Sequence, residues 1–296
     1  MKRIVRRRFH GTQNRLAFAF IELVLVITIL GMLVALHLPF YSRLRERTHI
    51  TIDQNNLRQI LQASAFYAAE NDERLAHPTW GGDLTGPDGW AYLTSRASRG
   101  VPGSIQFTPG SCAGRDADSP QFTNQLAFFK VGQVTQYLPD VKAAWCPKDV
   151  ATRRSGTLRS LWLGRPVKVT SYTWSATVGG LVGPISSRPP IGRTHKISDF
   201  LPTDWQTWEA NESNPFLFND AANDPSSPSD CPSLRHTGMQ RWWQVSVPVG
   251  PRALSGGAMV GQFGGSAELI RWPRVYDLFS QKVLPPNDIL NGPGYR

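Results

Sequence analysis

The sequence has few cysteines and none of the common catalytic motifs. Three cysteines occur, Cys112, Cys146 and Cys231, so at most one disulfide can form within the chain and its pairing stays open. No C-x-x-C pair and no Cys/His spacing typical of zinc sites appears. A G-x-S-x-G elbow, an H-E-x-x-H helix and a phosphate-binding loop are also absent. We therefore expect no catalytic residues and no enzymatic activity.

Acidic residues are absent from residues 1–17, which contain six lysines and arginines. These six account for most of the formal net charge of +10, and the rest of the chain has an excess of only about four positive charges. Such a small excess is weak support for a nucleic-acid partner, and we expect none.

An apolar run follows this basic segment, from Phe18 to Phe40, and contains one carboxylate, Glu22. A helix over this run would be about 34 Å long, enough to cross a hydrocarbon core of about 30 Å. Because basic residues stay in the cytoplasm, the pattern predicts a single-pass protein of the inner membrane. Its N-terminus would be cytoplasmic, its remainder periplasmic or extracellular, and membrane lipid would be one partner. A cleaved secretory signal fits less well, since no small-x-small site follows the run.

Glu22 distinguishes this run from a simple anchor. An ionised carboxylate within a bilayer costs about 2.5–3.5 kcal/mol, which favours a partner cation. Phe18, Glu22, Gly31 and Pro39 have the spacing found in type IV pilins and type II secretion pseudopilins, and the segment resembles the N-terminus of that family. The family has glycine before the cleavage point, where this chain has Ala17.

The resemblance implies processing by a prepilin peptidase, which would cut between Ala17 and Phe18 and methylate the new amine. It also implies assembly with other pilin-like subunits, in which Glu22 sets the axial register by pairing with such an amine. Gly31 and Pro39 match the glycine and proline of the family's helix. Pro39 has two interpretations, as a kink within a longer helix or as the end of the membrane helix.

Residues 41–72 have the period of an amphipathic helix that continues the apolar run to a stop at Asn71-Asp72. The predicted packed face comprises Leu44, Ile52, Leu57, Ile60, Leu61, Ser64 and Tyr67. The predicted polar face comprises Arg45, Glu46, Asp53, Asn55, Gln59 and Glu70. The predicted organisation is a leader over 1–17, a transmembrane helix over 18–40, its amphipathic continuation over 41–72, and a globular head over 73–296.

The head has the pattern of a loop-rich α+β domain. Alternating β-branched and aromatic residues predict strands over 167–178, 242–249, 258–263 and 266–272, the last two joined at Gly264-Gly265. Residues 73–130 and 183–203 are predicted to be largely loop, and 137–146 a short helix and turn. The fold class is therefore predicted as α+β, with a long N-terminal helix, transmembrane in its first half, packed on an antiparallel sheet.

Several pieces of the head resemble pilin-like proteins with a C-terminal H-x9-DG domain. These pieces are Trp145-Cys146-Pro147-Lys148-Asp149, Ser171-Tyr172, Arg235-His236 and Gly256-Gly257-Ala258. About nineteen residues separate His236 from Gly256, and Gly264 stands where that subgroup has aspartate.

Other candidate sites in the head carry weaker signals. Asp220, Asn223 and Asp224 lie in a polar loop that offers oxygen ligands for calcium, and no other cofactor is expected. Trp80 and Trp90 stand among glycines as candidate sugar-stacking residues. His236 is a candidate to pair with Cys231 or a nearby acid.

The sequence thus predicts a structural filament subunit. Two alternatives remain at this level: a membrane-anchored protein that binds carbohydrate or another surface without polymerising, and an anchored hydrolase whose site is not recognised. The patterns do not distinguish secretion from adhesion or DNA uptake, or a major subunit from one at the filament tip.

Overall fold

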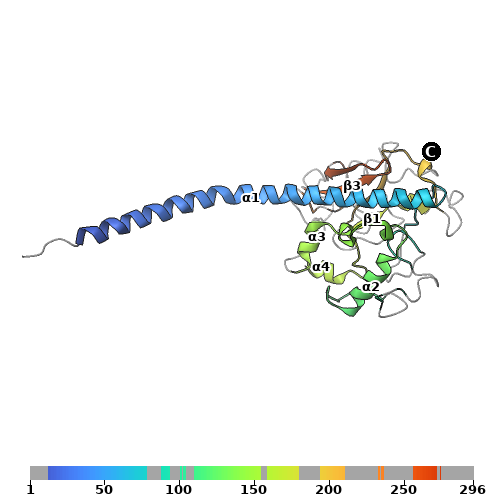
Figure 1. The fold of residues 1–296 in the computed structure, drawn as a ribbon, viewed down its shortest axis with the longest axis horizontal. Helices are drawn as coiled ribbons and strands as arrows, with labels where there is room; N and C mark the ends of the chain where they lie inside the picture. The colour runs from blue at the N-terminus through green and yellow to red at the C-terminus, as the bar shows by residue number, and fades with distance from the viewer. Residues whose placement is uncertain are drawn as a thin grey trace, which may run out of the picture. The chain divides into compact units, whose positions relative to one another are not determined.

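The structure is a computed structural model (Figure 1). It describes residues 13–78, 88–93, 101, 103–104, 110–154, 159–179, 194–210, 233, 235–236, 256–271 and 274. Within the first helix, the side chains of residues 13–19, 37–40 and 42 lie outside the description. The chain divides into two compact units, Met1–Arg47 and Thr48–Arg296, and each is described by itself.

The first helix, α1, extends over Gln13–Glu70. Pro39 lies inside α1, so the interpretation in which this proline ends a helix is wrong. The helix stops at the predicted place, and Asp72 and Glu73 have positive φ values of 53° and 64°. Backbone of this left-handed kind cannot continue an α-helix, and it turns the chain away from the axis of α1.

The transmembrane half of the predicted fold class is wrong. Among the residues that the structure describes, no helix is long and apolar enough to cross a membrane. The predicted location as a single-pass protein of the inner membrane is overturned by the same finding.

Short helices follow α1, and two of those described lie in the ranges 73–130 and 183–203 that were predicted to be largely loop. Their bounds are α2 Pro120–Lys130, η2 Thr135–Tyr137, η3 Val141–Ala144, α3 Pro147–Thr152, α4 Arg159–Gly164, η4 Ala176–Gly179 and η6 Ile197–Asp199. Ser119 caps α2, since its hydroxyl accepts a hydrogen bond from the amide of Phe122 at 3.3 Å, and Pro120 follows as the first helical residue. The first predicted strand is shorter than expected, because only Tyr172–Trp174 of residues 167–178 pair as β1.

The described strands form one antiparallel sheet in the order β1-β2-β3-β4. After β1 come β2 Trp205–Glu209, β3 Gly257–Gln262 and β4 Ala267–Arg271. The β3–β4 hairpin is the one predicted at Gly264-Gly265, where Gly265 has a φ of 84° that favours glycine. The predicted strand over 242–249 lies outside the described residues.

The second half of α1 packs on this sheet. Leu57, Ile60, Leu61 and Ser64 are buried as predicted, whereas Leu44 and Ile52 are 40% and 42% exposed and do not belong to the packed face. The helix approaches β3 at Gly261, where an added Cβ would lie 2.9 Å from Leu57 Cδ2 and 3.0 Å from Leu61 Cδ1. The absence of a side chain at Gly261 is what permits this close approach.

Replacing Gly261 with valine is expected to lower the free energy of unfolding by about 1–3 kcal/mol, because the new atoms overpack the contact between α1 and β3. The matched control is Gly164→Ala, since a Cβ at Gly164 meets nothing within 4 Å. Urea unfolding followed by tryptophan fluorescence measures both variants. Equal stabilities for the two would contradict the close approach at Gly261.

Trp90 is a core residue and not an exposed sugar-stacking residue. Its side chain is 1% exposed and stacks on Trp174, with ring centroids 4.9 Å apart. Tryptophan is a large apolar group, so this stack contributes to the core of the second unit and leaves no free indole face there. Trp80 lies outside the described residues.

Candidate functional site

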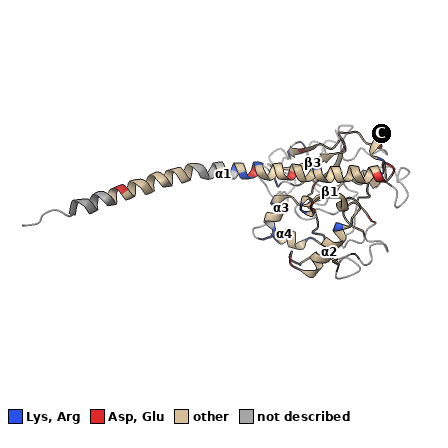
Figure 2. Cartoon of the chain, in the orientation of Figure 1, with Lys and Arg blue, Asp and Glu red and all other residues tan. Residues whose placement is uncertain are grey.

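The first candidate site is the apolar segment of α1 between residues 20 and 36. Each residue of this segment is exposed, with exposed fractions from 37% at Val24 to 73% at Leu36 among its large apolar side chains. Consecutive residues of a helix point in all directions around the axis, so the segment is apolar on every face. Its one charged residue is Glu22, the single red position in this stretch of α1 (Figure 2).

The other residues predicted for this site lie on the same helix. Ala17 and Phe18 belong to α1, but their side chains are outside the description. A Cβ at Gly31 would meet nothing within 4 Å. The predicted calcium ligands Asp220, Asn223 and Asp224 lie outside the described residues, so that prediction stays untested.

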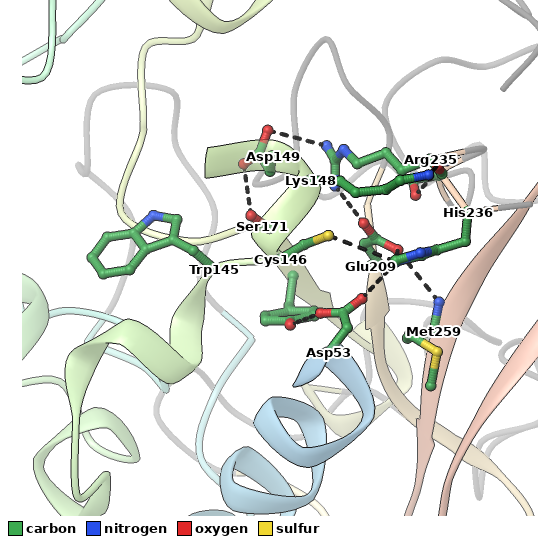
Figure 3. Close-up of polar contacts among 12 residues, drawn as sticks. Asp53, Trp145, Cys146, Lys148, Asp149, Ser171, Glu209, Arg235, His236 and Met259 are labelled. Atoms are coloured by element: carbon green, nitrogen blue, oxygen red, sulfur yellow. Dashed lines mark hydrogen bonds and ion pairs between the residues drawn. The ribbon is translucent and has the colours of Figure 1, made fainter. Parts of the chain in front are cut away.

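The second candidate site is a set of four polar side chains in the interior of the second unit. We call Asp53, Cys146, Glu209 and His236 the buried cluster (Figure 3). All four residues are 0% exposed. One atom from each, a carboxylate oxygen, the thiol sulfur or a ring nitrogen, lies within 4.8 Å of the corresponding atom of the others.

Each member of the buried cluster comes from a different part of the fold. Asp53 lies on α1, one turn before the packed residue Leu57, and Glu209 is the last residue of β2. Cys146 is the N-cap of α3. His236 is held against the start of β3, since its amide donates to the carbonyl of Gly257 at 3.1 Å.

His236 Nε2 is the centre of the buried cluster. It lies 3.0 Å from Asp53 Oδ2, 3.4 Å from Glu209 Oε2 and 3.7 Å from Cys146 Sγ. A ring nitrogen carries at most one hydrogen, which can point well at only one of these three acceptors. The three contacts are therefore not explained as three good hydrogen bonds.

Second partners hold the two carboxylates in place. Asp53 Oδ1 accepts a hydrogen bond from the hydroxyl of Tyr172, and Glu209 Oε1 accepts one from Arg235 Nη1 at 3.0 Å. In both carboxylates the other oxygen, Oδ2 or Oε2, faces His236. The carboxylates are thus oriented from outside, with one oxygen each directed at the same ring nitrogen.

A second group of buried charges adjoins the cluster. Asp149 accepts two hydrogen bonds from Arg165, at 2.8 and 2.9 Å, and one from Ser171 Oγ at 2.6 Å. Arg235 Nη2 lies 3.6 Å from Asp149 Oδ1, so Arg235 connects this aspartate to Glu209. These side chains are at most 2% exposed. The guanidinium of Arg165 thus makes two parallel hydrogen bonds to one carboxylate. Each buried charge in this group lies beside an opposite charge, which offsets the cost of burying it.

The ionisation of the cluster follows from burial and from these pairs. Burial, and then the charge of Glu209, raise the pKa of Asp53. Burial opposes ionisation of Glu209 as well, but the charges of His236 and Arg235 and the hydrogen bonds to this carboxylate together outweigh burial and lower the pKa of Glu209. For His236, burial lowers the pKa while Glu209 and Asp53 raise it, and the net direction is upward. Burial raises the pKa of the Cys146 thiol, so without a further cation this residue is a neutral thiol.

Sequence reasoning missed two of the four members. Asp53 was placed on the polar face of its helix, although it stands four residues before Leu57 and so shares the packed face. Glu209 lies in a strand whose five residues are all buried, which alternation does not reveal. Cys146 and His236 belong to the pieces that carry the H-x9-DG resemblance, as do Asp149, Ser171 and Tyr172. In the structure Tyr172 bonds to Asp53, and Ser171 bonds to Asp149. His236 was a candidate to pair with Cys231, which is outside the described residues, or with a nearby acid, and Asp53 and Glu209 lie 3.0 and 3.4 Å from its ring nitrogen.

Comparison of the chain with models of protein families, with curated proteins and with solved structures finds no match.

Proposed function

We propose that the chain is a structural subunit of a type IV-type filament, of the kind formed by pilins and type II secretion pseudopilins. A prepilin peptidase would cut before Phe18 and methylate the new amine. Residues 18–72 would then pack against the same segment of other subunits. The observation that carries this proposal is the apolar segment of α1, which is exposed on every face and contains one carboxylate.

An exposed apolar surface of this extent indicates an interaction site, because monomeric proteins rarely leave large contiguous apolar patches in water. A surface that surrounds a helix needs neighbours on all sides. Parallel copies of the same helix supply such neighbours, and their side chains interlock as in other helix pairs. Burial of a leucine or isoleucine from this segment contributes about 1.5–3 kcal/mol, so a few contacts per subunit give strong cohesion.

Glu22 gives this packing an axial register. Cleavage before Phe18 creates an amine with an ordinary pKa of about 7.7–8, four residues from Glu22 and so about one helical turn away. The amine of one subunit can pair with Glu22 of a neighbour. Within an apolar contact, an unpaired carboxylate is costly, so positions that leave Glu22 unpaired are disfavoured. Buried charged pairs of this kind are best known as devices that specify register.

The processing step can be tested by mass spectrometry of the mature N-terminus. The full chain is produced in one host that has a prepilin peptidase and in a matched host without it. We expect a chain that begins with N-methylated Phe18 in the first host and an uncut chain in the second. The variant Ala17→Gly has the residue found in the resembled family and should be cut at least as completely. An intact Met1 in both hosts, or a start beyond residue 35, would show that the proposal is wrong.

A further inference from the structure

We propose that the buried cluster binds one zinc ion, with Asp53, Cys146, Glu209 and His236 as its four ligands (Figure 3). This inference does not depend on the filament proposal, because it concerns the interior of the second unit alone. It rests on the distances within the cluster, the kinds of ligand atom and the orientation of the two carboxylates.

The three distances from His236 agree with a tetrahedral site. Zinc binds nitrogen and oxygen at about 2.0–2.2 Å and sulfur at about 2.3 Å, so two ligand atoms of one tetrahedron lie about 3.3–3.6 Å apart. From His236 Nε2, the distances to the two carboxylate oxygens are 3.0 and 3.4 Å, and the distance to the sulfur of Cys146 is 3.7 Å. Ligand atoms that surround a common centre explain this convergence better than one shared N–H does.

The kinds of ligand atom point to zinc. Calcium and magnesium prefer sites in which every ligand is oxygen. A site with a thiolate and an imidazole therefore favours neither ion. Zinc binds sulfur, nitrogen and oxygen ligands together, and in structural sites it is almost always tetrahedral. Because four side chains would fill the coordination shell and all four residues are 0% exposed, the site is closed. A closed site of this kind is structural, since no ligand position is left for a substrate.

The surroundings of the cluster resemble the outer shell of a metal site. Tyr172 donates to Asp53 Oδ1 and Arg235 donates to Glu209 Oε1, and both bonds leave the opposite oxygen directed inward. Outer partners of this kind fix the orientation of ligating groups and are a regular part of metal sites.

Charge balance permits the ion. The carboxylates of Asp53, Glu209 and Asp149 lie among the guanidinium groups of Arg165 and Arg235, which leaves one excess negative charge. Zinc bound to a thiolate and a neutral imidazole adds one net positive charge. The buried groups would then sum to zero. Zinc would therefore join α1, β2 and the start of α3 without leaving a charge uncompensated.

Metal content and cobalt substitution test the proposal on the full chain. The purified chain is unfolded in chelator, refolded with zinc, and dialysed before its metal is measured. We expect one zinc per chain and a lower Tm for protein refolded without metal. Refolding with cobalt should give the intense visible bands of a tetrahedral complex and a thiolate-to-cobalt charge-transfer band in the near ultraviolet.

Four variants locate the ion. Cys146→Ser should lose the charge-transfer band and the bound zinc, whereas Cys112→Ser and Cys231→Ser should keep both, and Cys112 is likewise a buried free cysteine. Tyr172→Phe keeps the ring and all four ligands and removes one outer hydrogen bond, so it should fold and bind zinc about 10–100-fold more weakly. This variant keeps the test decisive even where Cys146→Ser does not fold.

Several results would overturn the proposal. One such result is less than one zinc per chain after refolding, together with the same Tm in the presence and absence of zinc. It would show that hydrogen bonds and ion pairs hold the cluster together without metal. A cobalt complex without a thiolate band would exclude Cys146 as a ligand. Unchanged zinc affinity in Tyr172→Phe would place the metal elsewhere, and stoichiometric iron or copper in the native protein would exclude zinc as its metal.

Discussion

Replacing Glu22 with valine is expected to abolish assembly of the chain while leaving the fold of its second unit unchanged. The variant keeps the apolar segment of α1 and makes it continuously apolar, so helix contacts lose no hydrophobic surface. What it removes is the one charge that can distinguish a correct axial position from a shifted one. Without that charge the subunits have no preferred axial position, so a regular filament does not assemble.

Chemical cross-linking of assembled material, followed by size analysis, measures this effect. We expect a regular ladder of oligomers from the unaltered chain and none from Glu22→Val. The matched control is Thr28→Val, another exposed polar residue of the same segment, whose hydroxyl bonds only to the carbonyl of Leu25 at 2.8 Å in the described structure. A ladder that persists in Glu22→Val would assign the register to the apolar side chains alone.

Local patterns in the sequence predicted local structure well. The β3–β4 hairpin follows from alternation on both sides of Gly264-Gly265, and the stop of α1 follows from Asn71-Asp72. Leu57, Ile60 and Leu61 were predicted to be packed because three apolar residues at this spacing share one helix face. Each of these signals lies within a few residues of the structure that it predicts.

The buried cluster was not predictable in this way, since its members come from positions 53, 146, 209 and 236 and meet only through the fold. A carboxylate on a helix is ordinarily assigned to solvent, and burial of Asp53 depends on partners that the helix sequence does not contain. The sequence did contain one signal for the burial of Asp53, its position one turn before the packed residue Leu57. Asp53 was nevertheless assigned to the polar face because aspartate is charged.

The membrane prediction failed for a different reason. It rested on the length and mean hydropathy of an apolar run, and neither quantity depends on where each side chain lies in the structure. The described part of that run is exposed and apolar all round, and no helix among the described residues qualifies as a membrane span. The apolar residues therefore indicate a surface that needs a partner. The position of Glu22 within that surface favours another subunit as the partner.

Removing the Asp149 carboxylate is expected to have the largest effect on stability of any single change outside the buried cluster. Asp149→Ala removes the two hydrogen bonds and the ion pair that Asp149 makes with Arg165, in an interior where the Arg165 side chain is 2% exposed. Loss of one partner from a buried ion pair typically costs about 3–5 kcal/mol. Exposed pairs contribute at most about 1 kcal/mol, so Lys142→Ala, which removes the exposed pair with Asp140, is the matched control.

A double substitution distinguishes a lost pair from a general loss of packing. In Asp149→Ala combined with Arg165→Met, the guanidinium that loses its ion pair with Asp149 is also removed, and Arg235 keeps its bond to Glu209 at 3.0 Å. Urea unfolding should therefore show the double variant to be more stable than Asp149→Ala alone, with a coupling energy above about 1 kcal/mol. Additive losses would mean that the two side chains contribute separately.

The pH dependence gives an independent measure of the same pair. Burial opposes ionisation of Asp149, but Arg165 and Arg235 outweigh it and hold its pKa below the ordinary value. A carboxylate whose pKa is lower in the folded than in the unfolded chain contributes stability above its unfolded pKa of about 3.9 and loses that contribution as the pH falls further. The stability difference between the unaltered chain and Asp149→Ala should therefore be constant from pH 7 to about pH 5 and should shrink below about pH 4. A difference that disappears already near neutral pH would contradict a carboxylate held ionised by two arginines.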